Sequence, residues 1–295
     1  MQTSAAVAIR VTPQMRNRRG EMVRRLGRNQ LAMVGAMILV VVAFAAVFAP
    51  YLAPNDPLEM NPPLLLQAPS GEHLLGTDEF GRDILSRVIW GARISLYVGG
   101  ISVTIALLAG VSLGLIAGYY GGIVDDAINR VLDVVFAFPT ILLALGIVGM
   151  LGPSLTNTML AIGIVYTPQY ARLTRGTTLS VKERDFVDAA IVSGANDLRI
   201  IVRHILPNVT APLIIQTSLS LSLAILAEAS LSFLGLGTQP PDPSWGTMVN
   251  TGQRLIELSP WPVVFPGLAI ILAVLGFNLL GDGLRDVLDP RMRVE

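Results

Sequence analysis

The sequence predicts an all-α polytopic membrane protein with six transmembrane helices. Hydrophobic residues make up 52% of the 295 residues and charged residues only 14%, whereas about a quarter of the residues in a soluble domain are charged. The uncharged stretches are also long. A helix needs about 20 mostly apolar residues to cross a bilayer, and five runs of about that length or longer lack Asp, Glu, Lys and Arg: residues 31–49, 94–124, 134–171, 205–227 and 258–281.

The third run is too long for one crossing. It contains the segment GMLGPSLTNT at residues 149–158, whose glycines, proline and asparagine are typical of a tight turn. The run therefore divides into two helices. The six helices are expected near residues 31–50, 95–118, 134–150, 155–172, 209–230 and 263–281.

The order of these segments predicts how the chain is divided. We expect an Arg-rich tail at 1–29, then the first transmembrane helix with a Pro-rich extracytoplasmic loop at 30–92. A core transmembrane domain is expected at 93–283 and a second tail at 284–295. A secretory signal is the alternative for the first helix, since Val47-Phe48-Ala49 could end its apolar region, but that region is longer than signals usually have.

The arginines predict the orientation of the bundle. Seven of them precede the first helix, and cytoplasmic loops keep an excess of Lys and Arg. With six crossings, both termini lie on the cytoplasmic side of the membrane, and only Arg82, Arg87, Arg93 and Arg254 fall on the other side. The proline-rich outer segments include Trp245 and Trp261, which we expect either at the lipid headgroups or against a soluble partner.

Gly110, Gly114 and Gly118 recur every four residues in the second predicted helix. This spacing lines one helix face with residues that lack a side chain, so that a neighbouring helix can approach closely. The alternative is the ordinary frequency of glycine in membrane helices. We expect these three glycines to serve packing and not chemistry.

No catalytic residue and no metal site is predicted in this chain. The sequence has no cysteine and two histidines, His73 and His204, which fall on opposite sides of the predicted membrane as lone surface residues. The single lysine, Lys182, follows Val181, so the Gly-Lys pair of a phosphate-binding loop cannot occur. No cofactor is expected in the chain itself, and no nucleic-acid partner.

Glu228 is essentially the only ionisable residue within the six predicted helices. Ion-coupled transporters usually need a buried acid that binds and releases the coupling ion. Glu228 lies near the outer end of the fifth helix, where water or headgroups would reach it. An interfacial role and a functional intramembrane role both remain open.

The longest cytoplasmic connection, residues 182–207, predicts an elbow of two short helices. In the first helix Phe186, Ala189, Ala190 and Ser193 share a face, and Gly194 permits a bend. In the second helix a shared face is expected for Leu198, Ile201, Val202 and Ile205, with Pro207 ending the helix. A protruding phenylalanine among alanines suits docking into a groove of a partner; an amphipathic helix on the membrane surface is the alternative.

The elbow also carries a sequence signature. Asp188-Ala189-Ala190, Gly194 and Leu206-Pro207 resemble the cytoplasmic-loop motif of the inner-membrane permeases of binding-protein-dependent ABC importers. Asp188 stands where that motif has Glu, and His204 where it has Ile. The segments at 73–96, 232–248 and 277–291 resemble the second permease of dipeptide, oligopeptide and nickel importers, and the resemblance extends from about residue 25 onward.

The resemblance implies a type I importer in the bacterial cytoplasmic membrane, with two related permeases and an extracytoplasmic solute-binding protein. It also implies two ATP-binding subunits, which bind ATP and Mg and receive the elbow as a coupling helix. Two other functions stay open at this point: an ion-coupled secondary transporter or channel that uses Glu228, and a membrane scaffold that transports nothing. The solute is not predicted.

Overall fold

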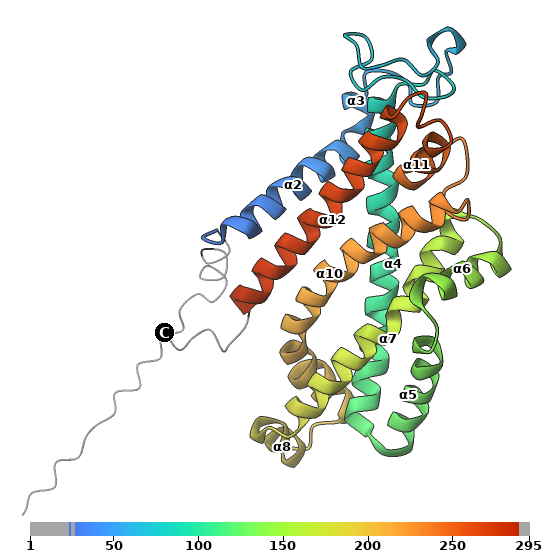
Figure 1. Cartoon of the computed structure of the whole chain (residues 1–295). Coiled ribbons are helices and arrows are strands. Elements are labelled where there is room, and N and C mark those ends of the chain that lie inside the picture. Colours follow the sequence, from blue (N-terminus) through green and yellow to red (C-terminus); the bar gives the residue numbers. More distant parts are fainter. Residues whose placement is uncertain (1–23, 25–26, 289–295) are drawn as a thin grey trace, which may run out of the picture.

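The computed structural model describes Arg24 and residues 27–288, which form helices and loops with no β-strand. The long helices run between a cluster of loops at one end and a short helix, α8, at the other (Figure 1). The helical segments are α2 (Gln30–Val47), α3 (Ala49–Leu52), η1 (Pro62–Leu64), α4 (Ile84–Tyr120), α5 (Gly122–Phe136), α6 (Thr140–Leu151), α7 (Leu155–Lys182), α8 (Asp185–Val192), α9 (Asp197–Ile200), η2 (Ile201–Ile205), α10 (Leu206–Phe233), α11 (Trp245–Gln253) and α12 (Trp261–Leu288).

Within the described residues, four helical runs are long and apolar enough to cross a membrane: α2, α4, the continuous stretch Asp197–Phe233, and α12. The bent pair of α5 and α6 would make a fifth. The remaining predicted crossing corresponds to α7, which has 28 residues but is the least apolar of the long helices. Several of its polar residues are buried inside the bundle, among them Thr158, Thr174 and Thr178.

The prediction of one helix at 134–150 is wrong, because the chain bends within this range. The chain forms α5 and α6 instead, which meet at an angle of 89°. Pro139 precedes the first residue of α6, and a proline both lacks an N–H donor and disfavours helical angles in the residue before it. Each piece is short: the 12 residues of α6 extend only about 18 Å. The turn predicted at 149–158 is confirmed, since α6 ends at Leu151 and Ser154 caps α7.

Helix α4 begins eleven residues before its predicted start and has 37 residues, a length of about 55 Å. Asp83 caps its N-terminus by accepting a hydrogen bond from the backbone N–H of Ser86 at 2.8 Å. The GTDEFGRD segment at 76–83 thus forms a turn and the cap of this helix. The expected division of the chain between residues 92 and 93 falls inside this helix. The expected tail at 1–29 lies almost entirely outside the described residues, as does most of 284–295.

The centre of the bundle is the contact between α4 and α7. Gly110, Gly114 and Gly118 all face α7: a Cβ atom at Gly110 would lie 2.5 Å from Cβ of Tyr170, and one at Gly114 would lie 2.5 Å from the carbonyl oxygen of Ala171. Real Cβ atoms do not approach other atoms this closely, so only glycine permits the observed separation of the two helices.

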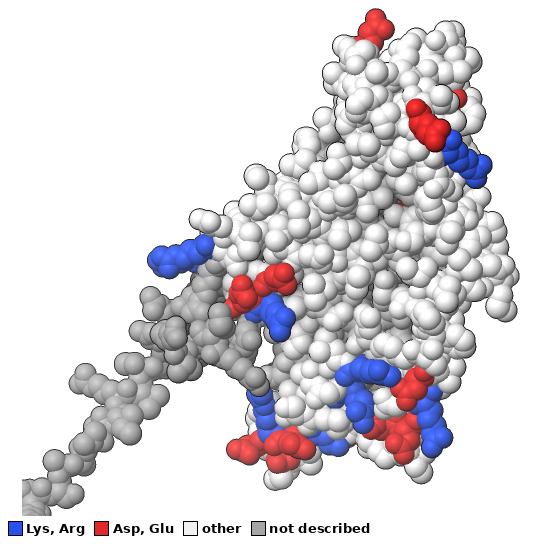
Figure 2. Space-filling model, viewed as in Figure 1, with Lys and Arg blue, Asp and Glu red and all other residues white. Residues whose placement is uncertain are grey.

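The outer loop cluster is held by buried ion pairs. Arg82 donates to Asp78 at 2.7 Å, and its second partner is Glu79 at 3.3 Å. His73 lies 3.0 Å from Asp83, the cap of α4. The expectation of a lone surface histidine is therefore wrong for His73, because the loop folds back onto the helix start. In Figure 2, charged side chains lie near the outer loops, at the opposite end of the bundle, and in a third group on the left of the view; the broad surface between these groups is uncharged on the face drawn.

Candidate functional site

The elbow, residues 182–207, lies at the end of the bundle opposite the outer loops (Figure 1). Its first helix, α8, follows α7 after a two-residue link, and α9 leads through the π-helical turn η2 directly into α10. The elbow is therefore inserted between two long helices of the bundle. A force on the elbow reaches α7 at one end and α10 at the other.

Gly194 makes the bend between α8 and α9. Its φ angle is +79°, which residues with a Cβ atom rarely adopt. The N–H of Gly194 donates to the carbonyl of Ile191, and the N–H of Ala195 donates to that of Ala190. These two bonds form a Schellman motif, the usual way in which glycine ends a helix. Asn196 then caps α9 by accepting a hydrogen bond from the N–H of Arg199.

The elbow carries large apolar side chains on its surface. The exposed fractions are 39% for Phe186, 50% for Ile191, 89% for Val192, 69% for Leu198 and 53% for Val202. Such a group of exposed apolar residues marks a contact site for protein or lipid. We call these five residues the apolar patch.

Other elbow residues anchor the patch to the bundle. Val187, Ile200 and Ile205 are buried and belong to the main hydrophobic core, and Ala190 packs against that core. Ala189 and Asp188 are exposed. Asp188 lies in the first turn of α8, where its charge is favourable next to the positive end of the helix dipole.

Two predictions for the second half of the elbow are wrong. Pro207 does not end a helix, because it lies in the first turn of α10. The N–H of Leu206 donates to the carbonyl of Ile201 and closes a wide π-turn before the proline. With this turn the helix continues although Pro207 has no N–H to donate. The predicted apolar face is also split: Ile205 is buried, whereas Leu198 and Val202 are exposed. A π-turn has more residues per turn than an α-helix, so the spacing used in the prediction does not hold.

Hydrogen bonds fix the elbow to α4. The hydroxyl of Tyr119 donates to Asp197 at 2.9 Å, and the ammonium of Lys182 donates to the backbone carbonyl of Tyr119. Ion pairs between two other helices near this end were not predicted either: Arg172 and Arg175 of α7 pair with Asp133 and Asp125 of α5. The acids and arginines lie in different helices, far apart in the sequence, so helical spacing gives no sign of these pairs.

Glu228 is completely buried, which corrects the expectation that water or headgroups reach it. Its carboxylate accepts hydrogen bonds from Ser95 of α4 at 3.2 Å and from Ser232 of α10 at 2.7 Å. The N–H of Thr238 donates in turn to the oxygen of Ser232. The acid thus joins α4 and α10 to the segment that precedes α11.

Trp245 is also buried, with 1% of its surface exposed, so it lies neither among headgroups nor against a soluble partner. Its indole N–H donates to the carbonyl of Val88 at 2.9 Å, and Gly91 leaves room for the ring. The segment carrying α11 is thereby packed into the outer half of the bundle.

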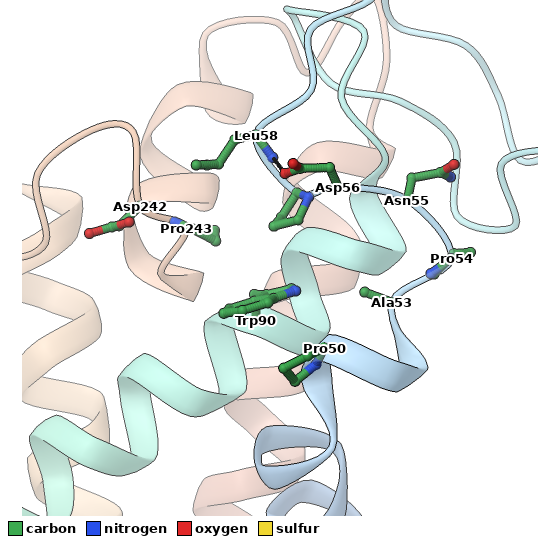
Figure 3. Close-up of a pocket in the computed structure, with 10 residues that line it drawn as sticks. Pro50, Ala53, Pro54, Asn55, Asp56, Leu58, Trp90, Asp242 and Pro243 are labelled. Atoms are coloured by element: carbon green, nitrogen blue, oxygen red, sulfur yellow. Dashed lines mark hydrogen bonds between the residues drawn. The ribbon is translucent and has the colours of Figure 1, made fainter.

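The outer end has an open cavity of about 500 Å³. The ring of Trp90 forms its floor in Figure 3, with Asp56 and Leu58 on one side and Asp242 on another. The backbone N–H of Leu58 donates to Asp56 at 2.8 Å. Among the described residues no group of three His, Cys, Asp or Glu side chains could hold a metal ion.

The chain matches two family models. Residues 110–294 match the binding-protein-dependent transport system inner membrane component, and residues 18–69 match the N-terminal transmembrane domain of oligopeptide transport permease C. The first match covers more than half of the chain and includes the whole elbow.

Similar proteins and structures agree with these matches. A dipeptide transport system permease protein of Alkalihalophilus pseudofirmus is 50% identical, over 92% of this chain and 90% of that protein. A di/tripeptide transport system permease of Pseudomonas aeruginosa is 48% identical, over 90% of this chain and 89% of that protein. A glutathione transport system permease of Pectobacterium atrosepticum is 44% identical, over 92% of this chain and 90% of that protein.

Among solved structures, an inward-facing MetNI methionine ABC transporter has a chain with a TM-score of 0.57 to this fold at 16% identity, covering 69% of this chain and 97% of that one. This likeness concerns the fold alone. Together with the family matches, it agrees with the helical bundle described above. The chain belongs to the family of inner membrane components of binding-protein-dependent transport systems.

Proposed function

We propose that this protein is the transmembrane permease subunit of an ATP-driven importer for short peptides. It forms half of a translocation pathway, and a second, homologous permease forms the other half. Two cytoplasmic ATP-binding subunits bind ATP and Mg, and an extracytoplasmic solute-binding protein delivers the solute. The family membership supports this function, and the relatives that transport dipeptides, tripeptides and glutathione support a peptide substrate.

The apolar patch of the elbow is the observation that carries the proposal. Phe186, Val192 and Leu198 are exposed on a rigid bend that is inserted between α7 and α10. A partner that covers this patch gains the free energy of burying apolar surface, about 25 cal/mol per Å². Closure of the ATP-binding subunits then moves α7 and α10 together, and the pathway opens to the other side of the membrane.

The orientation follows from the same assignment. The elbow meets ATP-binding subunits in the cytoplasm, so the loop cluster with its cavity faces the extracytoplasmic side. Both ends of the chain then lie inside, in agreement with the seven arginines before the first helix. The membrane is the bacterial cytoplasmic membrane.

Co-purification and ATP hydrolysis test the proposal. The chain is expressed with its second permease and the ATP-binding subunits, and the complex is reconstituted into liposomes with the solute-binding protein. We expect peptide to stimulate ATP hydrolysis and uptake, and F186D to abolish both while the chain remains in the membrane. Wild-type protein that purifies without ATP-binding subunits contradicts the proposal.

The second candidate, an ion-coupled transporter, depends on Glu228. Its complete burial and its two serine partners favour a structural role for this acid. The two functions differ in their energy source. Collapse of the proton gradient with ATP intact leaves uptake unchanged in an ATP-driven importer and stops it in a proton-coupled one.

A further inference from the structure

Two uncharged amides lie near the middle of the bundle, on α7 and α10. Gln169 lies midway along α7, and Gln216 lies in the first half of α10; both are half-buried. The side-chain N–H₂ of Gln216 donates to the oxygen of Gln169 at 3.5 Å and to the hydroxyl of Ser220 at 3.1 Å. The longer of these bonds is at the limit of a hydrogen bond.

The amide pair is only partly satisfied. Within the described residues, the N–H₂ group of Gln169 and the side-chain oxygen of Gln216 have no hydrogen-bond partner. A polar group without a partner in the hydrocarbon region costs several kcal/mol, since lipid offers neither donors nor acceptors. The helix surface that carries Gln169 and Gln216 therefore does not face lipid.

Other polar side chains on the outward surface behave differently. Thr104 and Ser112 of α4 are exposed, but each hydroxyl donates to the carbonyl four residues earlier, at 2.7 and 2.8 Å. Hydroxyls bonded in this way can face lipid at little cost. A glutamine side chain cannot satisfy both ends of its amide in the same way, which sets the pair apart.

The position of the pair connects it to the elbow. Helix α7 enters the elbow and α10 leaves it, so the two amides belong to the two helices that the elbow moves. Next to them, the hydroxyl of Tyr170 reaches Thr217 across the same contact at 3.3 Å. A small shift of α10 against α7 separates Gln169 from Gln216 and frees a donor and an acceptor on each.

We propose that Gln169 and Gln216 bind the peptide backbone of the solute midway through the membrane. A primary amide offers one donor group and one acceptor, which match the C=O and N–H of a peptide group. The amides contact the backbone of the solute, so the contact does not depend on the solute's side chains. Because neither residue is charged, the solute dissociates from them easily. This inference rests on the proposed function, since it takes the solute to be a peptide.

Cysteine accessibility tests the position of the pair. The chain has no cysteine, so Q169C and Q216C each introduce a single thiol. L108C is the matched control, because Leu108 is 64% exposed in the middle of α4, on a face whose hydroxyls, those of Thr104 and Ser112, are bonded within the helix. In the reconstituted importer we expect a charged, water-soluble thiosulfonate to label Q169C and Q216C but not L108C, and the transported alanine peptide to slow that labelling.

Two results overturn the inference: no labelling of either cysteine, which places the face against lipid or protein, or labelling that the peptide does not slow. Di-, tri- and pentaalanine serve as probes. If the wild-type importer takes up none of these peptides, the proposed function fails and this inference fails with it. If it takes up at least one of them, the proposed function stands, and the labelling result tests only this inference.

Uptake kinetics test the role of the amides. We expect Q169L/Q216L to raise the KM for peptide about tenfold, the effect of losing about one hydrogen bond. Y170F is the control, because it removes the neighbouring bond between the same two helices without touching the amides. An equal rise of KM in Y170F, or no rise in Q169L/Q216L, refutes the binding role.

Discussion

Tyr119, in the last turn of α4, donates a hydrogen bond of 2.9 Å to Asp197, the first residue of α9. The ammonium of Lys182 lies 5.4 Å from the centre of the same tyrosine ring and also donates to the backbone carbonyl of that residue. The inner end of α4, the end of α7 and the start of α9 therefore meet at one side chain. This contact holds the elbow at a fixed angle to the bundle.

The contact predicts the behaviour of Y119F. Loss of the hydroxyl removes one hydrogen bond to a charged group, worth about 1.5–3 kcal/mol, and loosens the elbow. We expect peptide-stimulated ATP hydrolysis to fall while basal hydrolysis persists. Y120F is the control, since Tyr120 is 53% exposed. Equal coupling in the two variants would show that the contact does not position the elbow.

The apolar patch predicts a loss of partner binding in L198D. A charge in the centre of a contact formed by apolar side chains is left without a partner and costs several kcal/mol. The ATP-binding subunits should no longer co-purify with this variant. L65D provides the comparison, because Leu65 is 49% exposed and directly follows η1 in the loops between α3 and α4. Retention of the ATP-binding subunits by L198D would place the docking surface elsewhere.

The bend at Gly194 predicts a backbone effect. A Cβ atom there meets no atom within 4 Å, so G194A acts only through the positive φ angle and costs about 1–2 kcal/mol. We expect lower peptide-stimulated ATP hydrolysis, and a stronger loss in G194P, because proline cannot adopt this φ. G176A, at an open helical position in α7, should leave coupling intact; a similar loss there would exclude the bend as the cause.

The glycine face of α4 predicts a packing effect. In G114A the new Cβ atom would lie 2.5 Å from the carbonyl oxygen of Ala171 and 2.6 Å from Cβ of Thr174. Helices α4 and α7 must separate, at a cost of about 1–3 kcal/mol. The detergent-solubilised protein should show a lower thermal unfolding midpoint. G100A should not, since nothing lies within 4 Å of a Cβ atom at Gly100.

The buried acid predicts different effects for two replacements. E228A leaves the hydroxyls of Ser95 and Ser232 without their acceptor, and each unpaired buried group costs about 1–3 kcal/mol. E228Q keeps an acceptor and the side-chain volume. Thermal unfolding should therefore show a large decrease for E228A and a small one for E228Q. If E228Q abolishes uptake without changing the unfolding midpoint, the acid has a role beyond structure.

Much of the fold could be predicted from runs of apolar residues and from short motifs. The lengths of these runs identify α2, α10 and α12, and the spacing of Gly110, Gly114 and Gly118 points to a close helix contact. What α4 packs against could not be predicted, because the partner residues Tyr170 and Ala171 lie far along the chain. The right-angle break at Pro139 was missed, since apolarity continues across it and only the proline marks it.

The site was predictable where local geometry decides it. Gly194 marks the bend because its backbone angle is a property of one residue. The burial of Glu228 and Trp245 depends on contacts with α4, which no local pattern reveals. The continuation from the elbow into α10 depends on a π-turn, and helical spacing assumes that no such turn occurs.

Helix α4 runs without interruption from Asp83, beside the outer ion pairs, to Tyr119 at the elbow. It contains no proline, and a continuous helix has no joint at which a displacement is absorbed. A tilt imposed on its outer end therefore appears at its inner end in the opposite direction, as in a lever. In the proposed importer, a displacement of the outer loops is therefore passed along α4 to the elbow, where we propose that the ATP-binding subunits bind.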